Sequence, residues 1–169
     1  MFFLNGFLLF FSFTCCTIEK EKHSPGDFMD CSHEANIFSA KFNGDIVFTS
    51  YDQAELHMSG SGFSAIGRKG LERYHISAFF DTLFPGLFLC DDFKWSKVSI
   101  VKQLSSGFHV HYFVDCNKEF QFEVEDIDFE KGVLCLRVAF TAVEVNPVYQ
   151  TVIEDGEVIV VEDGFLSFK

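Results

Sequence analysis

Residues 37–49, which read IFSAKFNGDIVFT, decide the fold class of this chain. Phe38, Ala40 and Phe42 alternate with other side chains, which is the period-two pattern of a strand that buries one face. Asn43-Gly44 follows, and this dipeptide readily adopts the positive φ angles of a two-residue hairpin turn. A second run rich in β-branched and aromatic residues comes after the turn. The sequence therefore predicts an antiparallel β-hairpin.

Similar short runs recur toward the C-terminus, and turn residues such as Glu154-Asp155-Gly156 separate them. The runs lie at residues 93–101, 108–114, 119–124, 133–145, 148–153 and 157–161. Turn-bounded strands at this spacing are typical of sandwiches and barrels. We therefore expect a mainly β fold, an antiparallel sandwich or barrel of about 8 strands.

One segment departs from the strand pattern. Between residues 71 and 84, apolar side chains recur at positions 71, 74/75, 78/79 and 83, which is close to helical spacing. Pro85-Gly86 would end such a helix. The sequence therefore predicts one helix near residues 71–84.

The N-terminus predicts export. Residues 1–18 carry no charged side chain and are shorter than the roughly 20 apolar residues of a spanning helix. We expect residues 1–16 to be a signal peptide, with a membrane anchor or a buried core segment as alternatives. Residues 17–35 mix charge with Ser, Pro and Gly and predict a flexible linker, which leaves residues 36–169 as a single β-rich domain. The expected location is secreted, periplasmic or membrane-attached, with membrane association through the N-terminal segment.

Four cysteines remain after such a leader is removed: Cys31, Cys90, Cys116 and Cys135. In an oxidising compartment they are candidates for two disulfides, and the sequence leaves all three connectivities open. Cys135 lies in a strand-like run, where a small buried hydrophobic residue is an equally good interpretation. The chain contains no Cys-x-x-Cys pair, so the zinc-ribbon and thioredoxin spacings are missing.

The charge balance excludes nucleic acid as an expected partner. The 169-residue chain has a formal net charge of −12, and phosphate backbones require a surplus of Lys and Arg. Residues 115–169 contain 13 acidic and 4 basic side chains. Acidic clusters steer basic partners, so this region predicts a protein-binding rim. Its candidate residues are Glu154, Asp155, Glu157, Glu162 and Asp163.

A glycine-rich stretch at residues 60–70 is a candidate anion site. Backbone N–H groups of such stretches can point at an anion, and Arg68, Lys69 and Arg73 would add positive charge. A phosphate loop would need Lys-Ser or Lys-Thr where Arg68-Lys69 stands. The alternative interpretation is a flexible loop with solvated charges.

His109 and His111 are candidate metal ligands. Side chains two residues apart on a strand share a face, so the two imidazoles could bind zinc or another transition metal. Asp115, His57 or His75 would be the third ligand. The alternative is that both histidines lie on the solvated face of a half-buried strand.

The sequence carries no Gly-x-Ser-x-Gly nucleophile elbow and calls for no cofactor. We therefore expect an exported or surface-attached, non-catalytic protein that acts by protein–protein interaction, with a basic protein as the candidate partner. The alternative is a metal- or anion-dependent enzyme or ligand carrier that uses His109/His111 or residues 68–73. The 24 phenylalanines support neither function, because most fall in the leader or at alternating strand positions that fill a β core.

Overall fold

The computed structural model of the chain describes residues 31, 36–50, 53–59, 61–80 and 82–169, with the backbone only at 92–97. The predicted leader at residues 1–16 lies outside the described residues, as does all of the predicted linker at 17–35 except Cys31. The described part is almost entirely antiparallel β-structure, which confirms the mainly β prediction.

Twelve strands and one 3₁₀ helix follow one another along the described chain. They are β1 (Ile37–Phe42), β2 (Asp45–Ser50), β3 (Glu55–Ser59), β4 (Gly62–Lys69), β5 (Glu72–Phe80), β6 (Gly86–Phe88), η3 (Cys90–Asp92), β7 (Phe93–Gln103), β8 (His109–Val114), β9 (Phe120–Asp128), β10 (Val133–Asn146), β11 (Thr151–Val152) and β12 (Val158–Phe168).

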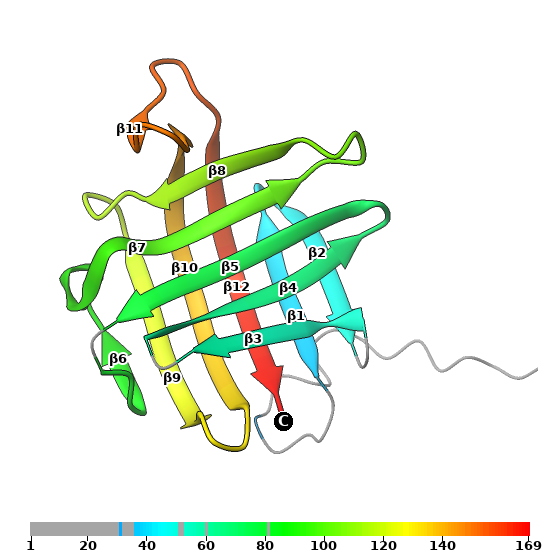
Figure 1. The fold of residues 1–169 in the computed structure, drawn as a ribbon, viewed down its shortest axis with the longest axis vertical. Coiled ribbons are helices and arrows are strands. Elements are labelled where there is room, and N and C mark those ends of the chain that lie inside the picture. The colour runs from blue at the N-terminus through cyan, green and yellow to red at the C-terminus, as the bar shows by residue number, and fades with distance from the viewer. Residues whose placement is uncertain (1–30, 32–35, 51–52, 60, 81) are drawn as a thin grey trace, which may run out of the picture.

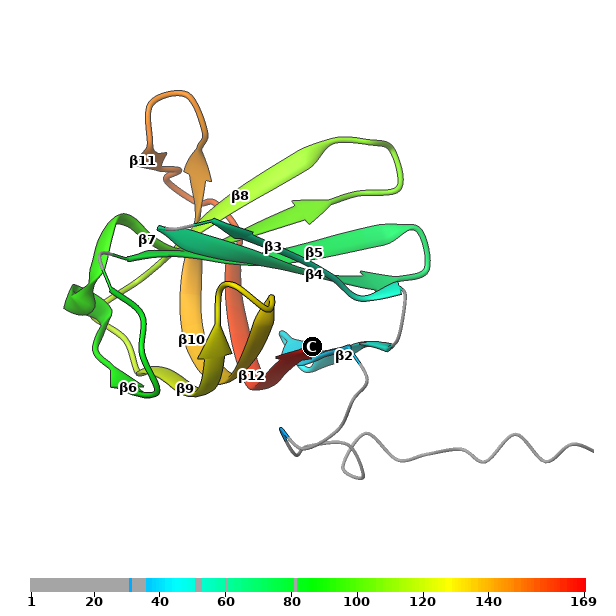
Figure 2. The ribbon, with the colours of Figure 1, turned by 60° about the horizontal axis from the view of Figure 1, so that its bottom comes forward.

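The strands form two layers that cross at a steep angle (Figure 1). The front layer has the order β3-β4-β5-β7-β8, and the back layer contains β2-β1-β12-β10 with β9 and β6 beyond β10. Figure 2 shows the front layer lying over the back one. Strand β10 joins the layers, because its first half pairs with β9 and its last residues pair with β8. The result is a continuous sheet folded into a sandwich.

The layers also meet at their other edge. There Gly67 of β4 lies directly against the Phe38 ring of β1, so closely that an added Cβ would sit 2.1 Å from the ring atom Cδ1. Aromatic and aliphatic side chains from both layers fill the space between, including Phe38, Tyr74, Phe122 and Leu136. The phenylalanine surplus thus builds the core, as the alternation in the sequence predicts.

The hairpin predicted from residues 37–49 is confirmed. Strands β1 and β2 pair antiparallel from Phe42 with Asp45 outward, and Asn43 and Gly44 form the turn with φ of 51° and 83°. The Asn43 side chain adds bonds to the neighbouring strand β12: it accepts from the backbone N–H of Val160 and donates to the carbonyl of Val158.

The helix predicted near residues 71–84 is wrong, because this segment forms strand β5. Tyr74, Ile76, Ala78 and Phe80 all point into the core, which is strict alternation. The pattern was obscured by Phe79, which is large and apolar but lies on the outer side of the strand. When an exposed aromatic residue stands next to a buried one, the two form an adjacent apolar pair, and such pairs resemble the spacing of a helix.

Two loop and strand assignments also need correction. The glycine-rich stretch is not a flexible loop, since residues 62–69 form β4 and pair with β3 on one side and β5 on the other. The run at 148–153 is mostly a turn, in which only Thr151–Val152 pair as β11. In the first stretch, tertiary pairing overrides local composition. In the second, hydrogen bonds from the backbone to the Asn146 side chain favour a turn.

The four cysteines form two disulfides, Cys31–Cys135 and Cys90–Cys116. The first attaches the segment before β1 to the outer side of the back layer, where Cys135 packs with Ile37 and Phe165 in a small second core. The second joins η3 to the turn after β8. Among the described residues, no helix has the length and apolar character needed to span a membrane.

Candidate functional site

The outer side of the front layer gathers an unusual set of polar side chains, which we call the histidine face. It consists of the outward residues of β3, β4, β5, β7 and β8, whose alternates point into the core. Its ionisable members are Glu55, His57, Arg68, Arg73, His75, His109 and His111, and its neutral polar members include Ser64, Ser77, Ser99 and Gln103. Every histidine of the described chain is on this face.

Strand register brings together the two candidate sites predicted separately from the sequence. Arg68 of β4 is paired with Arg73 of β5, Arg73 with Gln103 of β7, and Gln103 with His109 of β8. The arginines and His109 therefore form one row across four strands. Lys69 is not part of this face, since its ammonium group pairs with Asp45 of β2 at 3.0 Å.

A second row runs parallel to the first. His75 of β5 is paired with Val101 of β7, and Val101 with His111 of β8. The same row continues to Glu55 of β3 through Ile66 of β4. His57 lies one step further along β3, opposite Ser64, and the Ser77 hydroxyl donates to the Ser64 hydroxyl at 2.9 Å.

The histidine face carries permanent positive charge on its arginines and pH-dependent positive charge on its histidines. Arg68 forms an ion pair with Glu55, and this hydrogen bond lowers the pKa of the Glu55 carboxyl. Partial burial lowers the pKa of His75, and the nearby His109 and Arg73 lower it further. Burial and His109 likewise lower the pKa of His111. At neutral pH these two imidazoles are therefore uncharged, and they gain charge on acidification.

The geometry of the face does not assemble a metal-ligand set of three. The ring centroids of His109 and His111 are 6.5 Å apart, and none of Asp115, His57 or His75 joins them as a third ligand within the described part of the chain. The one group of three potential ligands found there is Cys31, Glu125 and Cys135. Its two sulfur atoms are bonded to each other, so they are not thiolate ligands.

The predicted acidic rim divides into two parts. Glu154, Asp155 and Glu157 lie between β11 and β12, in a segment that stands clear of both layers (Figures 1 and 2). Glu162 and Asp163 lie within β12, about 17 to 20 Å from Glu157 at the rise of an extended strand. The acidic residues are thus two separate features.

The projecting loop, residues 146–157, exposes apolar as well as acidic side chains. Val148, Tyr149 and Val152 are 78%, 76% and 65% exposed. The Asn146 side chain accepts hydrogen bonds from the backbone N–H groups of Val148 and Tyr149, and the Asn146 carbonyl accepts one from Gln150. These bonds fix the turn that presents the apolar tip.

The base of the projecting loop is attached to the core. The buried Tyr112 hydroxyl donates to the Glu157 carboxylate at 2.7 Å. The Glu144 carboxylate accepts from the backbone N–H of Glu157 at 2.8 Å. Glu157 therefore supports the loop, whereas Glu154 and Asp155 are exposed in a second turn, in which the backbone N–H of Gly156 donates to the Ile153 carbonyl.

A hollow of about 540 Å³ separates this loop from β8. Phe113, Val143, Val145 and Val152 supply apolar walls, and Asp91, Asp115 and Asn117 supply polar ones. It lies at the edge of the histidine face, because Val145 is paired with His111. The projecting loop and the histidine face are thus neighbouring features of one side of the molecule.

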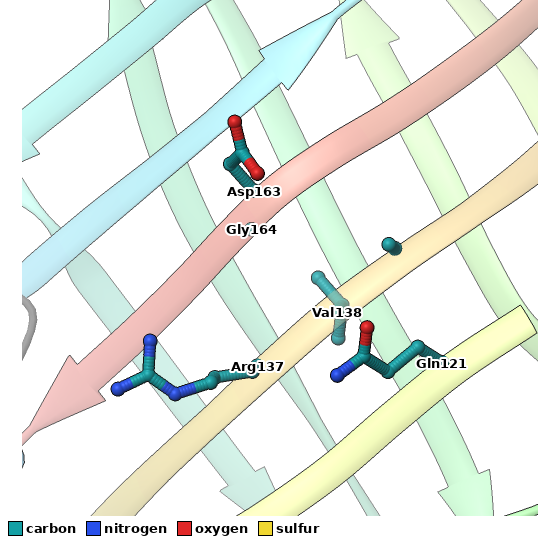
Figure 3. Close-up of a pocket in the computed structure, with 6 residues that line it drawn as sticks. Gln121, Arg137, Val138, Asp163 and Gly164 are labelled. Atoms are coloured by element: carbon teal, nitrogen blue, oxygen red, sulfur yellow. The ribbon is translucent and has the colours of Figure 1, made fainter.

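The second acidic pair lies on the opposite layer, at a bulge in β12. Asp163 has φ of 48°, and the register of β12 against β10 shifts between Val138 and Phe140. Figure 3 shows the shallow hollow of about 340 Å³ beside it, with Gln121, Arg137 and Asp163 on three neighbouring strands. Asp163 pairs with Lys41, and Arg137 pairs with Glu125 and covers the Phe165 ring. These charges are already satisfied by partners in the chain.

The chain matches no protein-family model, and searches of curated proteins and of solved structures find no match. The site is therefore defined by geometry alone.

Sequence reasoning missed two aspects of this side of the molecule. The run at 148–153 has strand composition, so its exposed apolar turn was not expected. The grouping of His75 with Arg73 was hidden by the incorrect helix. Alternation of Arg73, His75 and Ser77 with buried residues was the signal that could have revealed it.

Proposed function

We propose that this protein is an exported or surface-attached binding protein that acts through protein–protein contact rather than catalysis, with the projecting loop as its contact element and a basic protein surface as its partner. The observation that carries the proposal is the exposed tip, Val148 and Tyr149, held in a hydrogen-bonded turn on a loop that also exposes Glu154 and Asp155.

The loop combines the two properties that a protein contact requires. Tyrosine is enriched at the energetic centres of interfaces because a large, rigid ring buries much area at little conformational cost. Acidic residues at the rim accelerate encounter with a basic partner and suppress acidic ones. Because the tip is already ordered by Asn146, little further entropy is lost on binding.

Export is supported by the disulfides. Two disulfides in a small β domain are compatible with an oxidising compartment. The apolar, uncharged stretch at residues 1–18 supplies the export signal or attachment in this proposal. Fractionation of the native source that recovers the full-length chain, with its leader uncleaved, from the cytosol would contradict this part.

Photo-crosslinking in the native source tests the contact. A photoreactive phenylalanine analogue replaces Tyr149, and a control replaces Glu130, which is exposed in the turn between β9 and β10. We expect a discrete adduct from position 149 and none from position 130. An identical adduct pattern from both positions, or none from either, would overturn the proposal.

Once the partner is identified by crosslinking, binding measurements separate the contribution of the apolar tip from that of the acidic residues. Val148→Ser with Tyr149→Ser is expected to accelerate dissociation, because it removes buried apolar area. Glu154→Gln with Asp155→Asn is expected to slow association and to reduce its dependence on salt. If the acidic pair has no effect on association, the partner's contact surface is not basic.

A further inference from the structure

We propose that the histidine face binds anionic polysaccharide chains, and that it binds them more tightly in mildly acidic solution than at neutral pH. This goes beyond the protein contact proposed above, because it uses a different surface and a different class of ligand.

The spacing of the cations selects an extended ligand. Arg68, Arg73 and His109 occupy one row over β4, β5, β7 and β8, which is about 14 Å at the usual distance between strands. His75 and His111 repeat the arrangement one step along the strands. A single phosphate or sulfate reaches only one or two such groups, whereas a chain of charged units contacts several at once.

The wide spacing of these side chains also argues against a metal ion as the ligand. An ion needs donor atoms that converge on one point, and within the described chain no three potential ligands of this face lie close enough together. Charges spread over a flat surface instead match a polyvalent anion, which gains affinity from many weak contacts.

The neutral side chains of the face indicate a hydroxylated ligand. Ser64, Ser77 and Ser99 form a third row next to that of His75 and His111, and Gln103 lies within the first row. All four side chains offer both donors and acceptors. Sugar hydroxyls are matched by such groups. Among the described outward side chains of these strands, Phe79 is the one large apolar residue that is exposed, at 42%, and it lies at the other end of β5 from Arg73. A nucleic acid would favour several exposed aromatic rings for stacking, and a membrane surface would favour several apolar residues that insert between headgroups.

The charged groups around the face give the sign of the pH effect. On β3 and β4, Glu55 pairs with Arg68, and β5 adds Arg73. The outward residues described on β7 are uncharged, and those of β10 next to His111 are Val143 and Val145. Asp91 and Asp115 lie beyond Phe113, at the far end of β8. The face itself therefore carries a formal charge of +1 with neutral histidines.

Protonation of His75 and His111 raises this charge from +1 to +3. The pKa values of His75 and His111 are lowered, so the full gain is reached below the usual histidine range. Each exposed ion pair formed strengthens binding by a factor of about 1.5 to 5. Two new pairs together give an increase of about twofold to 25-fold on acidification.

The test measures binding of the intact, disulfide-bonded protein to heparin, a sulfated polysaccharide, with uncharged dextran as the reference chain. We expect heparin to bind about twofold to 25-fold more tightly at pH 5.5 than at pH 7.5 and dextran to bind at neither. Added salt is expected to weaken the binding, because these contacts are exposed.

Two variants of the face and one control variant make the test specific to the face. Replacing all four histidines, His57→Gln, His75→Gln, His109→Gln and His111→Gln, is expected to abolish the pH effect while circular dichroism shows an unchanged fold. Arg73→Gln is expected to weaken binding at both pH values. Lys118→Gln removes the same charge from the turn after β8 and is expected to leave binding unchanged.

Clear outcomes overturn the proposal. A pH effect that persists in the fourfold variant places the responsive groups elsewhere. Equal losses in Arg73→Gln and Lys118→Gln indicate attraction by overall charge only. Equal or tighter binding to single-stranded DNA or to vesicles of anionic phospholipid contradicts the polysaccharide assignment, and a requirement for added zinc contradicts the argument against a metal site.

Discussion

The side-chain hydroxyl of Thr49 accepts a hydrogen bond from the backbone N–H of Arg68 at 2.7 Å and donates one to the carbonyl oxygen of Arg68 at 3.1 Å. Thr49 is buried on β2 of the back layer, and Arg68 lies near the end of β4 in the front layer. The pairing of β3 with β4 ends at Ile66, so no β3 residue is paired with Arg68. One hydroxyl therefore satisfies both backbone groups and joins the two layers.

Replacing Thr49 with valine is expected to destabilise the protein by about 1–3 kcal/mol, because it leaves a partly buried N–H and a partly buried C=O of Arg68 without their partner. Thr49→Ser retains the hydroxyl and is expected to lose about 1 kcal/mol for its methyl group. Thr151→Val, at an exposed position of β11, is the matched control and should change stability by less than about 0.5 kcal/mol. Urea unfolding measures all three, and equal losses in Thr49→Val and Thr49→Ser would contradict the role given to the hydroxyl.

The close approach of Gly67 and Phe38 gives a second prediction. An alanine Cβ at position 67 would overlap the Phe38 ring, so Gly67→Ala is expected to destabilise by about 1–3 kcal/mol through overpacking. Phe38→Ala removes the ring atoms that clash. The double variant should therefore be more stable than the two single losses added together, which is tested by a double-mutant cycle. Strictly additive losses would show that the contact is not as close as described.

The first hairpin could be predicted from the sequence because its determinants are local. The turn dipeptide Asn43-Gly44 and the alternation of Phe38, Ala40 and Phe42 act within a few residues of each other. Most C-terminal strands were found for the same reason. Their order in the sheet was not predicted, since β1 pairs with β12 from the other end of the chain.

The histidine face could be predicted only in fragments. The shared orientation of His109 and His111 follows from strand periodicity, and Arg68 and Arg73 were noted as a basic pair. Their convergence depends on the pairing of β5 with β7 and of β7 with β8, which brings residues about 30 positions apart into one row. Register of this kind is set by the buried side of the sheet, not by the polar residues that it aligns.

The two disulfides are expected to differ in their contribution to stability. Cys31–Cys135 closes a separation of 104 residues and Cys90–Cys116 one of 26. Restriction of the unfolded chain therefore predicts losses of about 4.7 and about 3.6 kcal/mol when each pair is replaced by alanine. Guanidinium unfolding of Cys31→Ala/Cys135→Ala and Cys90→Ala/Cys116→Ala measures them. The oxidised wild type under reducing conditions should lose stability too, and unchanged unfolding there would show that the bonds are not formed.

The buried tyrosines predict a loss of stability in alkaline solution. Burial and the hydrogen bond to Glu157 raise the pKa of Tyr112, and burial and the bond to Glu72 raise the pKa of Tyr74. The unfolded chain releases these protons near pH 10, while the folded chain still holds them. The stabilising effect is therefore complete below pH 10 and declines above it, by about 1.4 kcal/mol per pH unit for each tyrosine.

Urea unfolding between pH 8 and pH 11.5 tests this dependence. Tyr112→Phe is expected to lower stability at pH 8 by about 1–2 kcal/mol, because a hydrogen bond to a carboxylate is lost, and to halve the decline above pH 10. Tyr149→Phe, whose side chain is exposed, is the control and should keep the profile of the wild type. A wild-type profile that stays flat to pH 11.5 would show that the Tyr112 hydroxyl is reached by solvent, and the projecting loop would then lack the attachment that Glu157 provides.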